Sequence, residues 1–173
     1  MLEIKNVYKT FNPGTVNQKV ALNDLNLTLE DGDFVTVIGG NGAGKSTMLN
    51  AVAGVWPVDE GRILIDGVDV TRLSEHQRAA YIGRVFQDPM TSLNPVKTIG
   101  EQIREVISYQ FGTDKAQAKK EAIELLRQVG INDPEQRYKQ YPHEFSGGMR
   151  QRVVIAIAIA CNPRILICDE PTT

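Results

Sequence analysis

The sequence predicts an α/β fold into which a helical region is inserted, and three observations support this prediction. The apolar run Phe34 to Ile38 is followed directly by a glycine-rich stretch and then by a segment without helix breakers. From Thr98 to about Tyr138 the apolar residues follow a helical period. A second apolar run, Ile165 to Cys168, ends in two acidic residues. The two buried strands belong to an α/β core, and the helical stretch lies between them.

Length and charge restrict the class of protein. The chain has 173 residues and a formal net charge of -2, which suits one soluble domain with a substantial core. It contains no basic block, so we expect no nucleic-acid partner. Its longest apolar run, Val153 to Cys161, is shorter than the roughly 20 residues of a membrane span, and its start lacks a signal-peptide segment. Cys161 and Cys168 have no metal-ligand spacing, so we expect reduced, structural thiols in the cytosol.

The first part of the chain predicts two strands, Leu2–Val7 and Val20–Leu29, joined by a loop at Asn12-Pro13-Gly14. Phe11 lies at the edge of this loop. An aromatic residue here is explained equally well by packing or by stacking on an adenine ring. Both interpretations stay open at this point.

The glycine-rich stretch after Ile38 fits the pattern of a phosphate-binding P-loop, in which Gly-Lys-Ser/Thr follows a first glycine after four residues. Its amides would converge on one anion at the positive end of the following helix. Lys45 would face the β- and γ-phosphates, and the Ser46 hydroxyl would be a ligand of Mg²⁺. We therefore predict that the chain binds a nucleoside triphosphate through Gly39, Gly40, Asn41, Gly42, Ala43, Gly44, Lys45, Ser46 and Thr47.

Local signals place the next elements. A strand at Arg62–Ile65 should turn back at Asp66-Gly67, and Ser74 should cap a short helix that continues to Tyr81. Another buried strand is expected over Ile82–Phe86.

The helical region should begin at Thr98, where Glu101 stands in the reciprocal capping position. Gly130 marks the end of a later helix. Ser146-Gly147-Gly148 should open a further helix, which is apolar on nearly all sides from Val153 to Ala160 and therefore buried.

Asp169 and Glu170 follow the last apolar strand, at the end of a strand where ligands bind in open α/β sheets. Together with an upstream P-loop, Asp169 suits the acid that holds Mg²⁺, and Glu170 is placed to polarise an attacking water.

Over essentially its whole length the sequence resembles the nucleotide-binding subunits of ABC transporters. The most specific marker is Phe145-Ser146-Gly147-Gly148-Met149, which is similar to the signature motif Leu-Ser-Gly-Gly-Gln but departs from it at Phe145 and Met149. The resemblance implies that Gln87 is the Q-loop glutamine, a ligand of Mg²⁺ and a coupling residue. It also implies that Phe11 stacks on adenine and that Glu170 is the catalytic base, and we add Val20 to the nucleotide-binding set.

The resemblance further implies that ATP and Mg²⁺ are held between the P-loop of one subunit and Ser146, Gly147 and Gly148 of a second copy or a homologous subunit, in a head-to-tail dimer. Transmembrane permease subunits would dock near Gln87 and the helical region, which places the chain at the inner face of the cell membrane. The fold implied is a P-loop NTPase core with an antiparallel β subdomain, lacking its C-terminal part. We expect boundaries at 1–89 for the β subdomain and P-loop core, 90–145 for the helical subdomain and 146–173 for the signature helix and the strand before Asp169.

Two departures from the family pattern leave alternatives open. The chain ends before the family's switch histidine, and neither His76 nor His143 can replace it, so an ATP-binding module with little turnover is the alternative to an ATPase. The residues from Met90 to the signature resemble di- and oligopeptide importers and the earlier residues another importer branch. We therefore expect a chimeric or recombinant chain with a junction near Gln87 to Thr91, and from the missing C-terminal elements we expect a fragment or a deliberately cut chain. Soluble ABC ATPases of ribosomes or DNA usually have two cassettes or a long insert, which this length does not allow.

Overall fold

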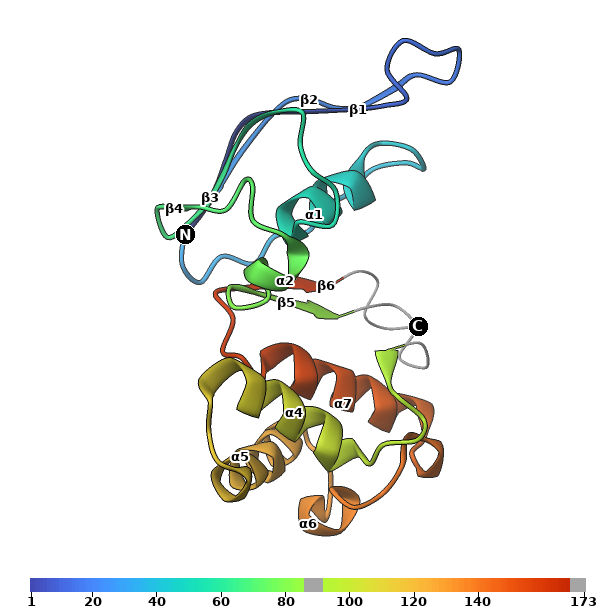
Figure 1. The fold of residues 1–173 in the computed structure, drawn as a ribbon. Helices are drawn as coiled ribbons and strands as arrows, with labels where there is room; N and C mark the ends of the chain where they lie inside the picture. The colour runs from blue at the N-terminus through green and yellow to red at the C-terminus, as the bar shows by residue number, and fades with distance from the viewer. Residues whose placement is uncertain (86–91, 169–173) are drawn as a thin grey trace. The chain divides into compact units, whose positions relative to one another are not determined.

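The computed structural model describes residues 1–85 and 92–168. The chain divides into two compact units, Met1–Ala79 and Ala80–Thr173 (Figure 1). Each unit buries its own set of apolar residues. The predicted boundaries near residues 89 and 145 remain predictions.

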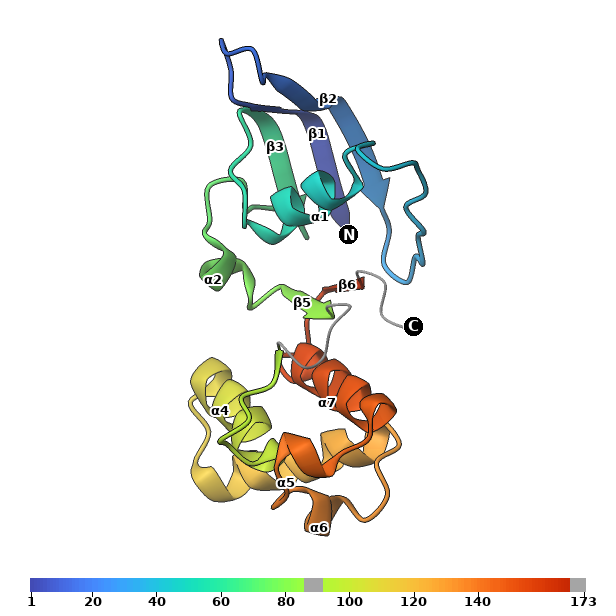
Figure 2. The same cartoon turned by 90° about the vertical axis from the view of Figure 1, so that its right-hand side faces the viewer.

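The first unit is built on an antiparallel sheet, as predicted. Its strands stand in the order β2-β1-β3-β4, and every neighbouring pair is antiparallel. Apolar residues at alternate positions, such as Leu2 and Ile4, are buried because successive side chains of a strand point to opposite faces. Helix α1 lies against the sheet (Figure 2). The elements of this unit are β1 (Leu2–Phe11), β2 (Lys19–Leu29), α1 (Lys45–Ala53), β3 (Glu60–Ile65), β4 (Val68–Asp69) and α2 (Glu75–Arg78).

Local signals in the first unit were largely sufficient to place its turns and caps. Asp66 and Gly67 have φ of 50° and 78°, which is the pair of positive values that a tight hairpin turn of this twist requires. Ser74 caps α2 in a reciprocal capping box with Gln77. Helix α2 nevertheless ends at Arg78, three residues before the expected Tyr81.

The predicted buried strand at Phe34–Ile38 is wrong. No strand is formed over these residues, and Phe34 and Ile38 are 94% and 88% exposed. Apolar, β-branched residues favour a strand only when a neighbouring strand supplies ladder hydrogen bonds and a covering layer. Among residues 1–85 and 92–168 this segment has no strand partner.

The second unit combines a short parallel sheet with a cluster of helices (Figure 1). Ile82 pairs with Ile165 and Val85 with Cys168, so the two apolar strands predicted for this region lie side by side. Of the predicted strand Ile82–Phe86, Phe86 lies outside the described residues. The elements are β5 (Ile82–Val85), α4 (Ile99–Phe111), α5 (Lys115–Gln128), α6 (Pro134–Arg137), a 3₁₀ helix (Pro142–Glu144), α7 (Gly147–Ile159) and β6 (Ile165–Cys168).

The starts of α4 and α7 and the end of α5 lie where their sequence signals predicted. Thr98 caps α4 and forms the reciprocal box with Glu101. Helix α5 stops just before Gly130, whose φ is 75°. Helix α7 packs against α4 and α5 through buried residues that include Val153 and Ala156, while its other residues between Gly147 and Ile159 are half-buried or exposed. In the described part of the chain, no helix is both long and apolar enough to cross a membrane.

Candidate nucleotide-binding site

The N-terminus of α1 is open to a ligand. Gly44, the residue before the helix, has φ of 88°, and a methyl group added there would lie 2.5 Å from the Ala21 carbonyl oxygen, so only glycine fits. No side chain caps the helix, and its first turn contains no acidic residue. The first amide groups of a helix have no partner within it, and the helix dipole favours an anion beside them. This end of α1 therefore has the chemistry of a phosphate site.

Lys45 adds a positive charge to the same loop. Its Nζ donates hydrogen bonds to the carbonyl oxygens of Gly39 and Gly40, the latter at 3.0 Å. The ammonium group is thus held over the loop by weak neutral acceptors that an anion could replace. Ser46 is exposed in the first turn and Thr47 is buried below it, so only the Ser46 hydroxyl is accessible to a ligand.

Strand β2 runs beside the P-loop. A methyl group at Gly42, where φ is 83°, would lie 3.6 Å from Lys19 Nζ, and Gly44 approaches Ala21 two residues further along the strand.

Phe11 on β1 is the cross-strand partner of Lys19. Val20 pairs with Thr10 and is 56% exposed. The structure therefore brings Phe11 and the P-loop into one part of the first unit.

Phe11 is held by its neighbours at the end of β1. Its ring packs edge-to-face on Trp56, with ring centroids 5.2 Å apart and an angle of 83° between the planes. Lys9 Nζ lies 5.6 Å from the centroid of the same ring. The Asp59 carboxylate accepts hydrogen bonds from Lys9 Nζ at 2.9 Å and from the Thr10 amide at 2.6 Å. These contacts fix the strand on which Phe11 stands.

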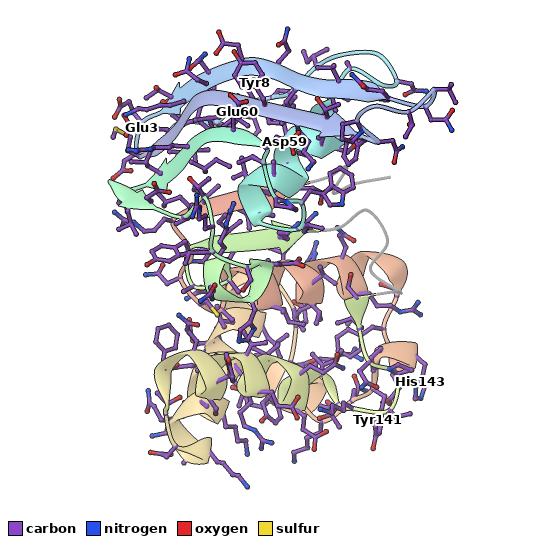
Figure 3. All side chains as sticks on the ribbon, turned by 45° about the horizontal axis from the view of Figure 1, so that its top comes forward. Glu3, Tyr8, Asp59, Glu60, Tyr141 and His143 are labelled. Carbon is purple, nitrogen blue, oxygen red and sulfur yellow. The ribbon has the colours of Figure 1, made fainter. Side chains whose placement is uncertain are left out.

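The carboxyl group of Asp59 stays ionised in this setting. Its partial burial raises the pKa, but the Thr10 amide and the Lys9 ammonium outweigh that effect and lower the pKa overall. Figure 3 shows Asp59 beside Glu60, which pairs with Tyr8 of β1. Sequence reasoning missed Asp59, because its partners are about 50 residues away along the chain.

A buried arginine anchors the other end of α1. Arg78 is only 2% exposed, and its NH1 donates to the carbonyl oxygens of Ala51 and Val52 at 2.7 and 2.6 Å. Its remaining nitrogens donate to Leu73 and Thr71 carbonyl oxygens. Burial lowers the pKa of Arg78 from its usual value. The last carbonyls of a helix lack partners within it, so the guanidinium both satisfies them and complements the helix dipole. No sequence signal identified this residue.

The Ser146-Gly147-Gly148 segment forms the N-terminus of α7. Ser146 caps the helix, and its Oγ accepts a hydrogen bond from the Met149 amide at 3.3 Å. Gly147 and Gly148 are exposed, and a methyl group added to either would meet nothing within 4 Å. Phe145 is 2% exposed in the helical core, so this departure from the usual leucine keeps an apolar anchor before the cap.

His143, just before this segment, is engaged in a local contact. Its ring stacks on Tyr141 with centroids 5.7 Å apart and 13° between the planes (Figure 3).

Cys161 and Cys168 are free thiols, and burial raises the pKa of Cys161, which keeps it protonated near neutral pH.

Three predicted site residues, Gln87, Asp169 and Glu170, lie outside the described residues. Two of them are expected ligands of Mg²⁺. Within residues 1–85 and 92–168, no three His, Cys, Asp or Glu side chains gather as a metal-binding group. Of the three expected metal ligands, Ser46 alone lies within the described residues.

Comparison with known proteins gives the family. The family model described as "ABC transporter" matches residues 22–173. The chain belongs to the ABC transporter family. It is 46% identical to the oligopeptide transport ATP-binding protein OppD of Bacillus subtilis, over 100% of this chain and 51% of that protein. It is 46% identical to the oligopeptide transport ATP-binding protein AmiE of Streptococcus pneumoniae, over 88% of this chain and 46% of that protein.

The ABC fold is also found among solved structures. The ATP-binding cassette MJ0796, in a dimeric post-hydrolysis state bound to ADP and Pi, matches 99% of this chain and 75% of its own with a TM-score of 0.84 and 33% identity. The chain spans about half the length of the curated relatives it matches. The match to the Bacillus protein runs over the whole chain, so the similarity gives no support to a junction near residues 87–91.

Proposed function

We propose that this chain is the ATP-binding and hydrolysing part of an ABC importer for peptides. The observation on which the proposal depends is the uncapped N-terminus of α1 with the Lys45 ammonium held over the loop before it. The peptide cargo is supported by the similarity to oligopeptide transport ATP-binding proteins.

In this proposal the residues of the first unit bind the nucleotide. Phe11 and Val20 face the base, the amides of Gly39–Thr47 take the phosphates, and Lys45 neutralises the β- and γ-phosphates. Ser46, Gln87 and Asp169 would hold Mg²⁺, for which hydroxyl, amide and carboxylate oxygens are suitable ligands. A bound Mg²⁺ would neutralise charge on the phosphate oxygens. Glu170 would orient and polarise the attacking water.

The second phosphate-binding surface would serve another subunit. Ser146, Gly147 and Gly148 are exposed at a helix N-terminus, and the space around both glycines leaves room for a ligand to approach the backbone. A dimeric cassette bound to ADP and Pi among the structural relatives supports this arrangement. We further propose that permease subunits dock near Gln87 and the helical region of residues 90–145, at the inner face of the membrane.

The experiment combines phosphate release with ATP-dependent dimerisation. The chain should release phosphate steadily, and Glu170→Gln should stop turnover while ATP-bound dimers accumulate in size-exclusion chromatography. Ser146→Arg should bind ATP as a monomer but form no dimer, because the long cation fills the surface that faces the second nucleotide. Dimers of Ser146→Arg at the wild-type level would contradict the sandwich arrangement.

ATP binding with little turnover is the second candidate function. The segment Phe34–Ile38 leads directly into the P-loop, and it has no strand partner within residues 1–85 and 92–168. Hydrolysis requires the loop to hold its groups within fractions of an ångström of the reacting geometry. Equal background phosphate release by the chain and by Glu170→Gln, with ATP still bound, would favour this candidate over the ATPase.

A further inference from the structure

We infer that Lys19 is a second lysine of the phosphate site, which contacts the phosphate chain of the nucleotide alongside Lys45. The inference rests on the proposed function, because it adds a residue to the same site. Lys19 belongs to none of the motifs described above, and its assignment comes from its position on β2.

The first support is the path of β2 along the P-loop. If Gly42 carried a methyl group, that group would lie 3.6 Å from Lys19 Nζ. A methyl group on Gly44 would lie 2.5 Å from the Ala21 carbonyl oxygen. These two contacts, two residues apart on both segments, place the start of β2 beside the loop. The Lys19 ammonium therefore lies beside the loop whose amides would bind phosphate. The Lys45 ammonium lies beside the same loop.

The second support is the pairing of Lys19 with Phe11. The two residues face each other directly across the β1–β2 ladder. Side chains of such a pair stand on the same face of the sheet, with Cβ atoms about 5 Å apart. A nucleotide whose base stacks on Phe11 and whose phosphates lie on the P-loop would therefore have Lys19 as a neighbour of both contacts.

The third support is the charge balance of this region. Lys9, two residues before Phe11, is paired with Asp59 at 2.9 Å. The Lys19 ammonium, by contrast, has neither an ion pair nor a hydrogen bond within residues 1–85 and 92–168. The first turn of α1 contains no acid that could neutralise it. A polyphosphate is the partner that this uncompensated charge suits.

The test titrates variants with ATP and with inorganic tripolyphosphate, each displacing a fluorescent ATP analogue. Lys19→Gln should bind both ligands about 3- to 10-fold more weakly, since an exposed charge pair is partly screened by solvent. Lys19→Arg should stay within about 2-fold of the unchanged chain. The matched control is Lys5→Gln, which removes the same charge from an exposed lysine on β1 that pairs with Glu3 at 2.9 Å, and it should also stay within about 2-fold.

Two outcomes would overturn the inference. Lys19→Gln could behave like Lys5→Gln with both ligands, which would make Lys19 an ordinary solvated lysine. It could also weaken ATP but leave tripolyphosphate unchanged, which would mean that Lys19 acts through Phe11 and the hairpin. Lys45→Ala separates this inference from the proposed function: if that variant keeps full affinity for both ligands, the phosphate site itself is wrongly assigned. A loss in Lys45→Ala without a loss in Lys19→Gln overturns the inference alone.

Discussion

The N-termini of α1 and α7 are both rich in glycine, but they differ in the hydrogen-bond partners of their first amide groups. At α7, the Ser146 hydroxyl accepts the Met149 amide, and the glycines that follow are surrounded by open space. At α1, no side chain caps the helix, Gly44 is confined by the Ala21 carbonyl, and Lys45 supplies a fixed cation.

The difference suggests separate roles for the two segments. The α1 terminus leaves its amides free and supplies a cation, so it can hold an anion without help from another chain. At the α7 terminus the Ser146 hydroxyl already accepts the hydrogen bond of one of the first amides, that of Met149. We therefore expect this terminus to contribute to a nucleotide site only when a second surface presents the phosphate.

Removing the anchor of α1 should have the largest effect. Arg78→Ala leaves the Val52 carbonyl without its buried donor and the Ala51 carbonyl with the Gly54 amide alone, and we expect a loss of about 3–4 kcal/mol in the free energy of unfolding of the first unit. Urea unfolding followed by the fluorescence of Trp56, the one tryptophan of the sequence, measures it. Arg62→Ala, at an exposed arginine of β3, is the control and should change the free energy by about 0.5 kcal/mol or less. Equal effects of the two substitutions would show that Arg78 does not anchor α1.

Adding one methyl group should separate the two glycine segments. Gly44→Ala places a side chain at φ of 88° against a carbonyl oxygen, so we expect the first unit to lose about 2–3 kcal/mol and ATP affinity to fall. Gly147→Ala enters open space at the first position of α7 and should stay within about 0.5 kcal/mol. Thermal unfolding and ATP titration of the pair measure both effects. If Gly44→Ala is as well tolerated as Gly147→Ala, the close contact between the loop and β2 is wrong.

Removing the cap of α7 should have the smallest effect. Ser146→Ala deprives the Met149 amide of its acceptor and should cost about 1 kcal/mol, whereas Ser146→Asp retains an acceptor and should stay close to the unchanged chain. Because the long helices of the second unit dominate the far-ultraviolet circular dichroism, urea unfolding followed at 222 nm is a suitable measurement. No cost in Ser146→Ala would mean that the hydrogen bond from the Met149 amide to Ser146 contributes nothing to stability, and the contrast between the two helix N-termini would disappear.

Features set by neighbouring residues could be predicted from the sequence. The capping box of Thr98 and Glu101, the turn at Asp66-Gly67 and the helix stop at Gly130 depend on residues a few positions apart. The same holds for the glycine and lysine pattern of the P-loop, since its chemistry lies within nine consecutive residues.

Features set by distant partners could not be predicted. The strand expected at Phe34–Ile38 had the right residue types, but composition does not say whether a neighbouring strand is present. Arg78, one of many polar residues in the sequence, is buried only because α1 ends beside it. Lys19 gained its meaning from the β1–β2 register, which places it opposite Phe11 and beside Gly42.

The central claim is that the α1 terminus with Lys45 binds the phosphates of the nucleotide. The most direct measurement is the affinity of Lys45→Ala for ATP by calorimetric titration, beside the unchanged chain and Lys5→Ala. We expect Lys45→Ala to bind ATP about 100-fold more weakly, which corresponds to the loss of a charge-assisted contact of about 2.7 kcal/mol, while Lys5→Ala keeps its affinity. Tight ATP binding that survives in Lys45→Ala would contradict the account.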